Sequence, residues 1–563
     1  MVEGRYQKSH IIGRTIANMA DSQTLAAGDT SGGRATLFGT LAAHVGAGRA
    51  AWLVACGLAV VVLSAWFNRG FLSYDEHFQI LEFAWYKLGR APADTLAWEF
   101  REQMRPGLQP LMAVWAARGV EAVGVVSPFV LAFLLRLVSG LLGVWVSLAV
   151  AIRVLPEVRN ERLKVALLAG SLLLWFLPFA HVRFSADNWG GLLFFAGLCL
   201  LMDSVGSTPR WDGRPGRRAA MAAVGAAGLL WGFAFYFRYQ IGFSIAGAGC
   251  WLLFVRRARP AVVAALASSF LMACAACTLA DRWLYDAWVF TPYEYLRANL
   301  IEGKAASFGL EPWWYYLGQM LLFLIPPFSL VLVGLLGAAA WYERRHVLIW
   351  TTVPFLVGHS LIGHKEVRFL VPITYAVVPL LVLAADRFAS GAPDRLARWT
   401  RSRGGRFAVR TFVAFNLAAL AVVTVKPSHE TEILFRWLWD ASAERPITVY
   451  TATESPYRFL SLEICFYRHP GTTVRNFETI EGLRQAAAAA PGRVFFFHRS
   501  FSPPDWLAAS GLEVVPVART LPQWVTRVNV NNWVSRMRVW TVFSIRAGVG
   551  SNYKRGPFPA TGM

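Results

Sequence analysis

The sequence predicts a polytopic α-helical membrane protein with a small α/β domain at its carboxyl-terminal end. The chain has 563 residues, of which 56% are hydrophobic and 16% are charged, whereas soluble domains average about 25% charged residues. Apolar runs of about 18–25 residues, long enough to cross a bilayer as helices, recur up to residue 425. Residues 426–563 lack such runs and carry short strand patterns instead.

The amino-terminal segment, residues 1–49, is polar and rich in Gly, Ala and Thr, which predicts a disordered cytoplasmic tail. A membrane domain follows over residues 50–425, with about eleven transmembrane helices, each near the length that spans a bilayer. The predicted spans are 50–67, 127–152, 164–180, 187–205, 219–236, 240–255, 260–280, 316–340, 346–363, 369–385 and 407–425.

Two outer loops interrupt the membrane domain, over residues 68–126 and 281–315. Within the first loop, Glu76–Leu88 and Leu108–Val123 have the amphipathic pattern of helices that lie in the membrane interface. Both loops combine charged and aromatic residues. Aromatic and polar side chains together could line a sugar or lipid site, or they could form an interfacial belt.

The loops between the spans alternate in charge, and this alternation predicts the topology. Short loops rich in Arg stay in the cytoplasm. With the predicted spans, the Arg-rich loops all fall on one side of the membrane, and the outer loops, His364–Arg368 and the tail fall on the other. The net charge of +21 fits this rule, and no nucleic-acid motif accompanies it, so nucleic acid is excluded as a partner.

The tail, residues 426–563, has β-branched and aromatic segments typical of strands. These segments are Ile447–Tyr450, Val494–Phe497, Leu512–Val517 and Val539–Ile545, and the Ala-rich Leu483–Ala490 predicts a helix. We therefore expect a small extracytoplasmic α/β domain. Cys274 and Cys277 have the spacing of a redox or metal pair, but inside an apolar helix they are expected to serve packing.

A polar stretch, Ser73–Gln79, follows the first span directly. Charge at a membrane surface is costly unless it has a role or faces water. Partial desolvation there could raise the pKa of Asp75 or Glu76 towards neutrality, as a general base for an attacking hydroxyl requires. The alternative is a solvated carboxylate pair flanking the span.

A second polar cluster, His364-Lys365-Glu366-Val367-Arg368, interrupts apolar sequence almost 300 residues later. Lys365 and Arg368 lie on the side that the positive-inside rule leaves poor in cations, which indicates an anion such as phosphate. On a helical turn these two side chains would share a face and could hold one phosphate together. Interface anchors with snorkelling side chains are the alternative.

A third group, His181, Arg183, Asp187 and Asn188, could contact substrate, or Asp187 could simply cap the following span. The sequence has no Walker loop, GxSxG elbow, HExxH or paired CxxC site, so neither nucleotide binding nor a metal site is predicted.

These segments resemble the dolichyl-phosphate-mannose-dependent mannosyltransferases of glycosyltransferase family 22, most of all its glycosylphosphatidylinositol (GPI) mannosyltransferase members. The matching stretches are DEHFQ from Asp75, WEF from Trp98 with Arg105 after it, DRWLYDAW from Asp281 and HKEVRF from His364. Three positions depart from the family: Ser73-Tyr74 replaces His-Pro, and Pro106 stands where Ser is usual. The resemblance covers residues 50–465.

The resemblance implies a GT-C fold and transfer of a sugar, mannose in the first place, from a polyprenyl (dolichyl-type) phosphate donor to a lipid-linked or glycan acceptor, with inversion. It implies that Asp75 is the base, that Glu76 positions the acceptor, and that His364, Lys365 and Arg368 hold the donor phosphate. Further substrate contacts are expected from His77, Gln79, Glu99, Arg105, Asp281, Arg282, Tyr285 and Glu366.

No metal or other cofactor is required for a monophosphate donor, and a divalent ion stays open. The Ala/Arg/Gly-rich composition and the lack of Asn-x-Ser/Thr sites favour a bacterial inner membrane with a periplasmic site over the endoplasmic reticulum. A lipid-linked glycan transporter is the alternative function; it would need polar groups spread through the bundle at the bilayer midplane. A glycan polymerase or ligase would share the logic of the site.

Overall fold

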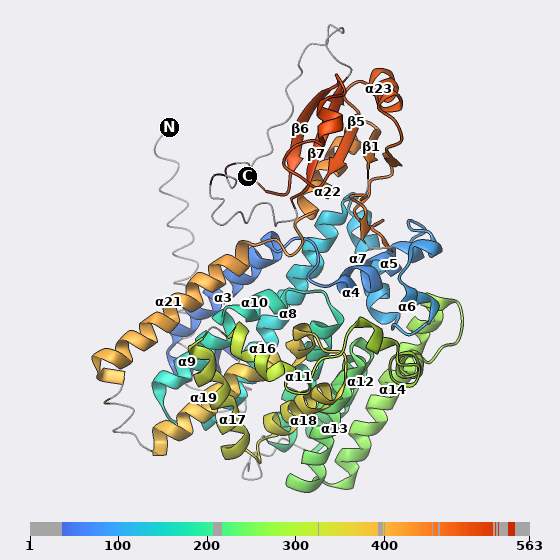
Figure 1. Cartoon of the computed structure of the whole chain (residues 1–563). Coiled ribbons are helices and arrows are strands. Elements are labelled where there is room, and N and C mark those ends of the chain that lie inside the picture. The colour runs from blue at the N-terminus through green and yellow to red at the C-terminus, as the bar shows by residue number, and fades with distance from the viewer. Residues whose placement is uncertain are drawn as a thin grey trace, which may run out of the picture.

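The computed structural model describes residues 37–206, 217–324, 326–391, 398, 400–452, 454–459, 462–521, 524, 527 and 539–546. A bundle of helices forms the larger part, a strand-rich domain lies at one end of it, and short helices of the first outer loop lie between the two (Figure 1).

Within the described residues, seven helical segments are long and apolar enough to cross a membrane. They are α3 (Ala47–Phe67), α8 (Pro128–Val154, continued by η3, Leu155–Glu157), α11 (Ala186–Val205), α12 (Arg217–Phe237), α14 (Pro260–Tyr285), η8 with α19 (Val367–Ile373 and Thr374–Gly391) and α21 (Arg403–Val425). Each coincides with a predicted span. The protein is thus a polytopic helical membrane protein, as predicted.

The other predicted spans are shorter or broken helices, so the count of about eleven stays a prediction. These helices are α9 (Glu161–Leu173), α10 (Phe176–His181), η4 (Tyr239–Ile241), α13 (Gly242–Cys250), η5 (Trp251–Val255), α16 (Tyr315–Phe323), α17 (Phe328–Tyr342) and α18 (Val347–Leu361). The predicted span 316–340 is interrupted between α16 and α17, where Pro326 and Pro327 lack the backbone N–H groups that a continuous helix needs.

The predicted disorder of residues 1–49 is wrong for the last part of that segment. Leu37–Val45 forms α2, and Leu41 and Val45 are buried against the bundle. Leu37, Leu41 and Val45 recur every four residues, so one apolar face of this short helix can pack. Residues 1–36 lie outside the described residues.

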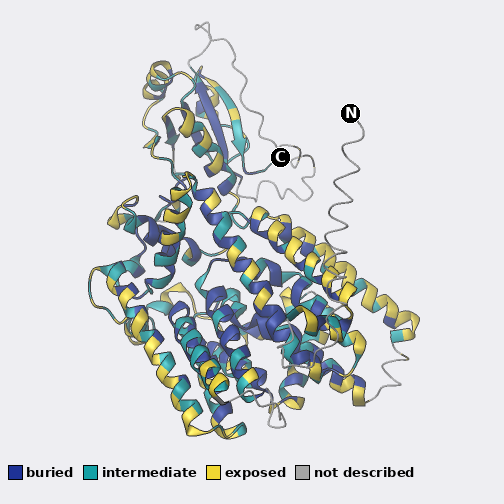
Figure 2. Ribbon diagram, turned by 180° about the vertical axis from the view of Figure 1, so that it is seen from behind, coloured by how far each residue is buried: buried dark blue, intermediate teal, exposed yellow. Residues whose placement is uncertain are grey.

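The outward faces of α14 and α21 are exposed along their length (Figure 2). Of an apolar stretch of 18 residues in α14, only 22% is buried inside the protein, and the corresponding share for α21 is 11%. Apolar side chains that face outward in this way suit contact with lipid.

Close helix packing positions the segment that carries Arg368. A Cβ at Gly191 of α11 would lie 2.5 Å from the carbonyl oxygen of Pro372 in η8. Because glycine has no side chain, α11 and η8 can approach each other this closely. Arg368 in η8 and Asp187 in the first turn of α11 are thereby brought to the same place.

The outer loops are built from short helices. The first contains α4 (Tyr74–Glu76), η1 (His77–Leu81), α5 (Glu82–Lys87), η2 (Ala93–Thr95), α6 (Trp98–Arg101) and α7 (Leu108–Ala122), and the second contains α15 (Thr291–Leu296), η6 (Arg297–Ile301) and η7 (Lys304–Phe308). The helices predicted over 76–88 and 108–123 are confirmed. η1 is a π-helix, a rare form that often occurs at functional sites.

The carboxyl-terminal domain contains a five-stranded sheet in the order β4-β1-β5-β7-β6, in which β4, β1 and β5 are parallel and β7 is antiparallel to β5 and β6. The strands are β1 (Ile447–Thr451), β4 (Thr472–Asn476), β5 (Val494–His498), β6 (Glu513–Arg519) and β7 (Thr541–Arg546), with α22 (Glu432–Glu444), α23 (Ile480–Ala489) and α24 (Asp505–Ala508). The predicted strands and helix are confirmed, whereas β4 was not predicted because its sequence, TTVRN, is largely polar.

A small hairpin, β2 (Arg458–Phe459) and β3 (Leu462–Glu463), extends from this domain to the outer loop. Phe459 stacks on Tyr74 with ring centroids 3.8 Å apart. A second contact is polar: the backbone N–H of Phe466 donates to Glu82 Oε1 at 3.0 Å. The domain is therefore in direct contact with the loop that carries Asp75.

Candidate active site

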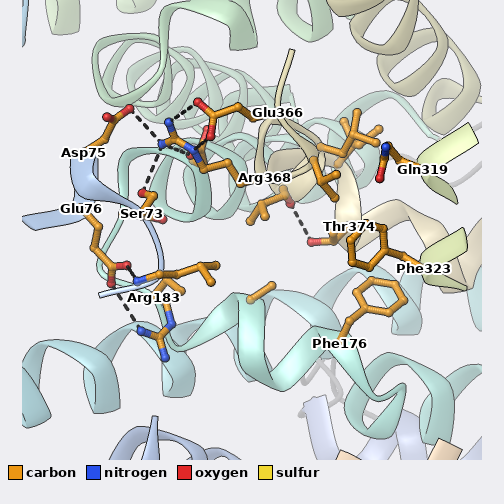
Figure 3. Close-up of a pocket in the computed structure, with 18 of the residues that line it drawn as sticks. Ser73, Asp75, Glu76, Phe176, Arg183, Gln319, Phe323, Glu366, Arg368 and Thr374 are labelled. Atoms are coloured by element: carbon orange, nitrogen blue, oxygen red, sulfur yellow. Dashed lines mark hydrogen bonds and ion pairs between the residues drawn. The ribbon is translucent and has the colours of Figure 1, made fainter. Parts of the chain in front are cut away.

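A cavity of about 1270 Å³ opens between the outer loop and the bundle. One end is polar and charged, and it is lined by Ser73, Asp75, Glu76, Gln79, Glu99, Arg183, Asp187, Glu366 and Arg368. The rest is largely an apolar arm that runs between α10, α16, α17, α18 and α19, lined among others by Phe176, Met320, Phe323, Leu336, Val353 and Leu380. Figure 3 shows both parts, with Asp75 and Arg368 at the polar end and Phe176 and Phe323 in the arm.

Arg368 lies at the centre of the polar end. Its Nε and Nη2 donate to the two carboxylate oxygens of Glu366, both at 2.7 Å. Its Nη1 donates to Asp75 Oδ2 at 2.9 Å and to Ser73 Oγ at 3.2 Å. The two polar stretches of the sequence, separated by almost 300 residues, therefore meet at one guanidinium group.

The charged row continues beyond Asp75. Arg105 Nη2 lies 3.9 Å from Asp75 Oδ2 and 3.7 Å from Glu99 Oε1. Gln79 then donates from Nε2 to the same Glu99 oxygen at 2.8 Å. Carboxylates and arginines thus alternate in space from Glu366 to Glu99. We call this arrangement the charged row; its members are Glu366, Arg368, Asp75, Arg105 and Glu99.

Buried ion pairs flank the charged row. Arg238 Nε lies 2.9 Å from Asp187 Oδ1, and the other oxygen of Asp187 lies 3.7 Å from Arg368. Arg183, also buried, lies 3.8 Å from Glu76 and donates to the backbone carbonyl of Asn68 at 2.9 Å. The sequence indicates Arg183 and Asp187 as possible substrate contacts. It does not indicate the ion pair between Asp187 and Arg238, because nothing local links these two residues.

The electrostatics of Asp75 differ from the expectation. Burial by itself raises its pKa, but the positive charges of Arg368, Arg105 and Arg238 outweigh burial and bring the pKa of Asp75 below the usual range of an aspartate. The predicted rise towards neutrality is therefore wrong. A carboxylate with a lowered pKa is a weak proton acceptor and a strong partner for a cation.

Lys365 and Arg368 do not share a helical face. The prediction that both side chains bind one phosphate from the same helical turn is therefore wrong. Glu366 has extended backbone angles, φ −134° and ψ 147°, and helical structure begins only at Val367. Lys365 is buried and donates from Nζ to the backbone carbonyl of Glu311 at 2.7 Å. His364 lies beside Glu366, with its Nε2 3.3 Å from Oε1, but it does not line the cavity.

Several residues predicted to contact substrate hold the loop instead. Asp281 accepts from the backbone N–H of Gly107 and from the Thr291 hydroxyl, both at 2.8 Å. The hydroxyl of Tyr285 donates to the backbone carbonyl of Arg105 at 2.7 Å. These contacts fix the backbone on both sides of Pro106, and Arg282, their neighbour, is exposed and does not line the cavity.

His77 also lies outside the cavity. It is fully buried, its Nε2 lies 2.9 Å from Glu82 Oε1, and its ring stacks on that of Tyr467 with centroids 5.5 Å apart. His77 therefore takes part in the contact between the outer loop and the carboxyl-terminal domain. The described residues include no group of three or more His, Cys, Asp or Glu side chains placed to hold a metal ion.

The fold and the site define an integral membrane protein in which an apolar cavity leads to a row of charged side chains. The family model described as the Alg9-like mannosyltransferase family matches residues 52–436, more than half of the chain. The chain belongs to this family, which confirms the family predicted from the residues.

The relatives found include GPI mannosyltransferases. The chain is similar to GPI mannosyltransferase 3 of Yarrowia lipolytica, with 25% identity over 340 residues, 60% of this chain and 62% of the relative. It is also similar to GPI mannosyltransferase 3 of Gibberella zeae, with 27% identity and 59% of each chain covered. The chain thus spans less than two thirds of the length of these relatives.

Among solved structures, the fold is similar to that of ArnT from Cupriavidus metallidurans bound to undecaprenyl phosphate. The TM-score is 0.49 and the identity 16%, and the match covers 88% of this chain and 98% of that chain.

Proposed function

We propose that this protein transfers one sugar, mannose in the first place, from a polyprenyl phosphate to a hydroxyl of a lipid-linked or glycan acceptor, with inversion. The observation that carries the proposal is the combined cavity, in which an apolar arm inside the bundle leads directly to Arg368. A polyprenyl chain suits the arm because it is wholly apolar, and the phosphate that it carries would then reach the guanidinium group. Membership of a mannosyltransferase family supports the same reaction class.

Arg368 is the proposed contact for the donor phosphate. In this structure the Nε and Nη2 groups of Arg368 bind Glu366. The side chain of Glu366 is 38% exposed, which makes it the most exposed ion-pair partner of Arg368. A phosphate offers the same bidentate geometry as a carboxylate and could replace Glu366. Negative charge grows on the phosphate oxygen as the bond to the sugar breaks, so a fixed cation favours the transition state over the ground state.

The charged row is at the end of the cavity that is lined by residues of the first outer loop and by Phe459 and Leu462 of the carboxyl-terminal domain. The positive-inside rule assigns these loops to the non-cytoplasmic side, where a lipid-linked sugar rather than a nucleotide sugar is the available donor. We propose a GT-C glycosyltransferase in a membrane of this topology. The composition supports a bacterial inner membrane, whereas the family relatives that we name belong to fungi, so the endoplasmic reticulum stays the alternative.

The transporter alternative is less well supported. A transporter needs polar groups along the path through the bundle. The ionisable residues that line this cavity belong to the outer loops, lie near the outer ends of α10, α11 and α18, or, in the case of Arg368, lie at the start of η8. The arm is otherwise lined mainly by apolar side chains. A polymerase or ligase of lipid-linked glycans would use the same charged row with a different donor.

Binding of the polyprenyl chain in the apolar arm is tested by a substitution that narrows the arm. Gly337 lines the arm, whereas Gly334 on the same helix does not, and a Cβ at either glycine would meet no atom within 4 Å. We expect Gly337→Trp to raise the KM for a long-chain polyprenyl-phosphate mannose by about tenfold, or about 1.4 kcal/mol of binding, with kcat little changed. The KM for a short-chain prenyl analogue should stay the same because that chain does not reach the arm.

Gly334→Trp is the matched control, with the same added volume outside the cavity, and its kinetics should equal those of the wild type. Steady-state transfer of labelled mannose with the two donors provides the measurement. Equal KM values for the long-chain donor in both variants would contradict binding of the lipid chain in the arm.

A further inference from the structure

The hairpin β2–β3 of the carboxyl-terminal domain forms part of the wall of the cavity. Two of its residues, Phe459 and Leu462, line the cavity together with Tyr74 of the outer loop. The ring of Phe459 stacks on the ring of Tyr74, with centroids 3.8 Å apart and an angle of 17° between the ring planes. Aromatic pairs in such contact stabilise a structure beyond the effect of the area that they bury.

The base of the hairpin is fixed to the core of its own domain. Tyr457, just before β2, is 2% exposed and stacks on Phe435 of α22 with ring centroids 5.2 Å apart. Just after β3, the backbone N–H of Ile464 donates to the carbonyl of Tyr457 at 2.7 Å. The folded carboxyl-terminal domain therefore sets the position of Phe459.

Tyr74 lies in the chain between the two residues through which the outer loop binds Arg368. Arg368 Nη1 donates to Ser73 Oγ at 3.2 Å and to Asp75 Oδ2 at 2.9 Å (Figure 3). Ser73 is the N-cap of α4, and Tyr74 and Asp75 are the first two residues of this three-residue helix. A displacement of Tyr74 in so short a helix therefore also displaces Ser73 and Asp75.

Two further contacts fix the segment that follows Asp75. The ring of His77 stacks on that of Tyr467, and Glu82 accepts from the backbone N–H of Phe466. The carboxyl-terminal domain thus contacts α4, η1 and α5 in turn. Of these contacts, the stack of Phe459 on Tyr74 is the one next to Asp75 in the chain and in the cavity wall.

We propose that Phe459 and Tyr74 are positioning residues for sugar transfer, an inference that rests on the proposed function. Their stack fixes α4 so that Ser73 and Asp75 hold the guanidinium group of Arg368 at the end of the apolar arm. The carboxyl-terminal domain thus takes part in the active site, although Phe459 and Leu462, which it contributes to the cavity wall, are apolar.

The test is a double-mutant cycle in the full-length protein, with Tyr74→Ala, Phe459→Ala and the variant that carries both changes. The assay is single-turnover transfer from saturating labelled polyprenyl-phosphate mannose to a membrane lipid extract. We expect each single change to lower the rate by ~10–100-fold, because a displacement of about 1 Å in an active site can cost that much. The double variant should be no slower than the slower single variant, because both changes remove the same stack.

Phe459→Tyr keeps the aromatic ring and should transfer at the wild-type rate. Phe459→Leu keeps apolar volume without a ring and should be as slow as Phe459→Ala. Phe477→Ala is the matched control, because Phe477 stacks on Trp506 in the same domain, with centroids 4.3 Å apart, and does not line the cavity. Its melting temperature in detergent should fall, whereas its transfer rate should equal that of the wild type.

Transfer by Phe459→Ala and Phe459→Leu at the wild-type rate overturns the inference. So does a double variant whose loss is the product of the two single losses, because the two residues then act separately. A loss in Phe477→Ala as large as that in Phe459→Ala overturns it as well, because the domain then acts only through its stability. In all three outcomes the wild type still transfers mannose; if the wild type transfers none from the lipid donor, the proposed function itself fails.

Discussion

Arg368→Ala is expected to lower sugar transfer by ~10²–10³-fold, the usual loss when one charge-stabilising group is removed from an active site. Arg368 is the cation that joins the two polar stretches, with contacts to Asp75, Ser73 and Glu366. Without it, the donor phosphate loses the guanidinium group that we propose as its partner at the end of the apolar arm. The rate of mannose transfer from polyprenyl-phosphate mannose provides the measurement.

Arg368→Lys should have an intermediate rate. Lysine keeps the charge but acts as a point charge and cannot form the two parallel hydrogen bonds of the guanidinium fork. Arg282→Ala is the control, since Arg282 is exposed and does not line the cavity. Transfer by Arg368→Ala at the rate of Arg282→Ala would show that the phosphate binds elsewhere.

Asp281→Ala is expected to destabilise the outer loop by about 1.5–3 kcal/mol, the range for a hydrogen bond to a charged group. Asp281 is fully buried, and its two oxygens accept from Gly107 and Thr291. Its loss leaves buried donors unpaired and frees the backbone next to Arg105. The melting temperature in detergent should fall, and so should transfer, because Arg105 and Glu99 lose their fixed positions.

Asp281→Asn keeps one acceptor oxygen and should lie between alanine and wild type in both measurements. A role of Asp281 in substrate contact, as expected from the sequence, predicts a different pattern. In that case transfer would fall while the melting temperature stayed at the wild-type value.

The membrane fold could largely be predicted from the sequence because its signal is simple. Apolar runs near the length of a bilayer predicted all of the long spans, and β-branched segments predicted most of the sheet. Broken helices were harder. Residues 316–340 have a continuous apolar composition, and only the two prolines at 326 and 327 indicate that the helix ends.

The two polar stretches indicated a shared site that contains Asp75 and Arg368. They did not indicate the role of each residue in that site. Lys365 was assigned to the phosphate by its spacing from Arg368, and this spacing has that meaning only in a helix. The extended backbone at Glu366 turns Lys365 away to the carbonyl of Glu311. No pattern within the sequence could show this turn.

The direction of a pKa shift and the pairing of buried charges depend on tertiary contacts, so they could not be predicted from the sequence. The pKa of Asp75 is lowered by arginines from the outer loop, from the segment after α12 and from η8, which only the folded chain brings together. The same holds for Asp187, in the first turn of α11, and Arg238, which directly follows α12; the two form a buried ion pair. A single carboxylate in a polar stretch therefore predicts a site, but not the direction of its pKa.

The identity of the donor tests the central claim most directly. Purified protein is given membrane lipid extract and labelled mannose, supplied either as polyprenyl-phosphate mannose or as GDP-mannose, and the label in the lipid products is counted. A site in which a lipid arm leads to Arg368 predicts transfer from polyprenyl-phosphate mannose and none from GDP-mannose. Transfer from GDP-mannose, with polyprenyl-phosphate mannose inert, would contradict it.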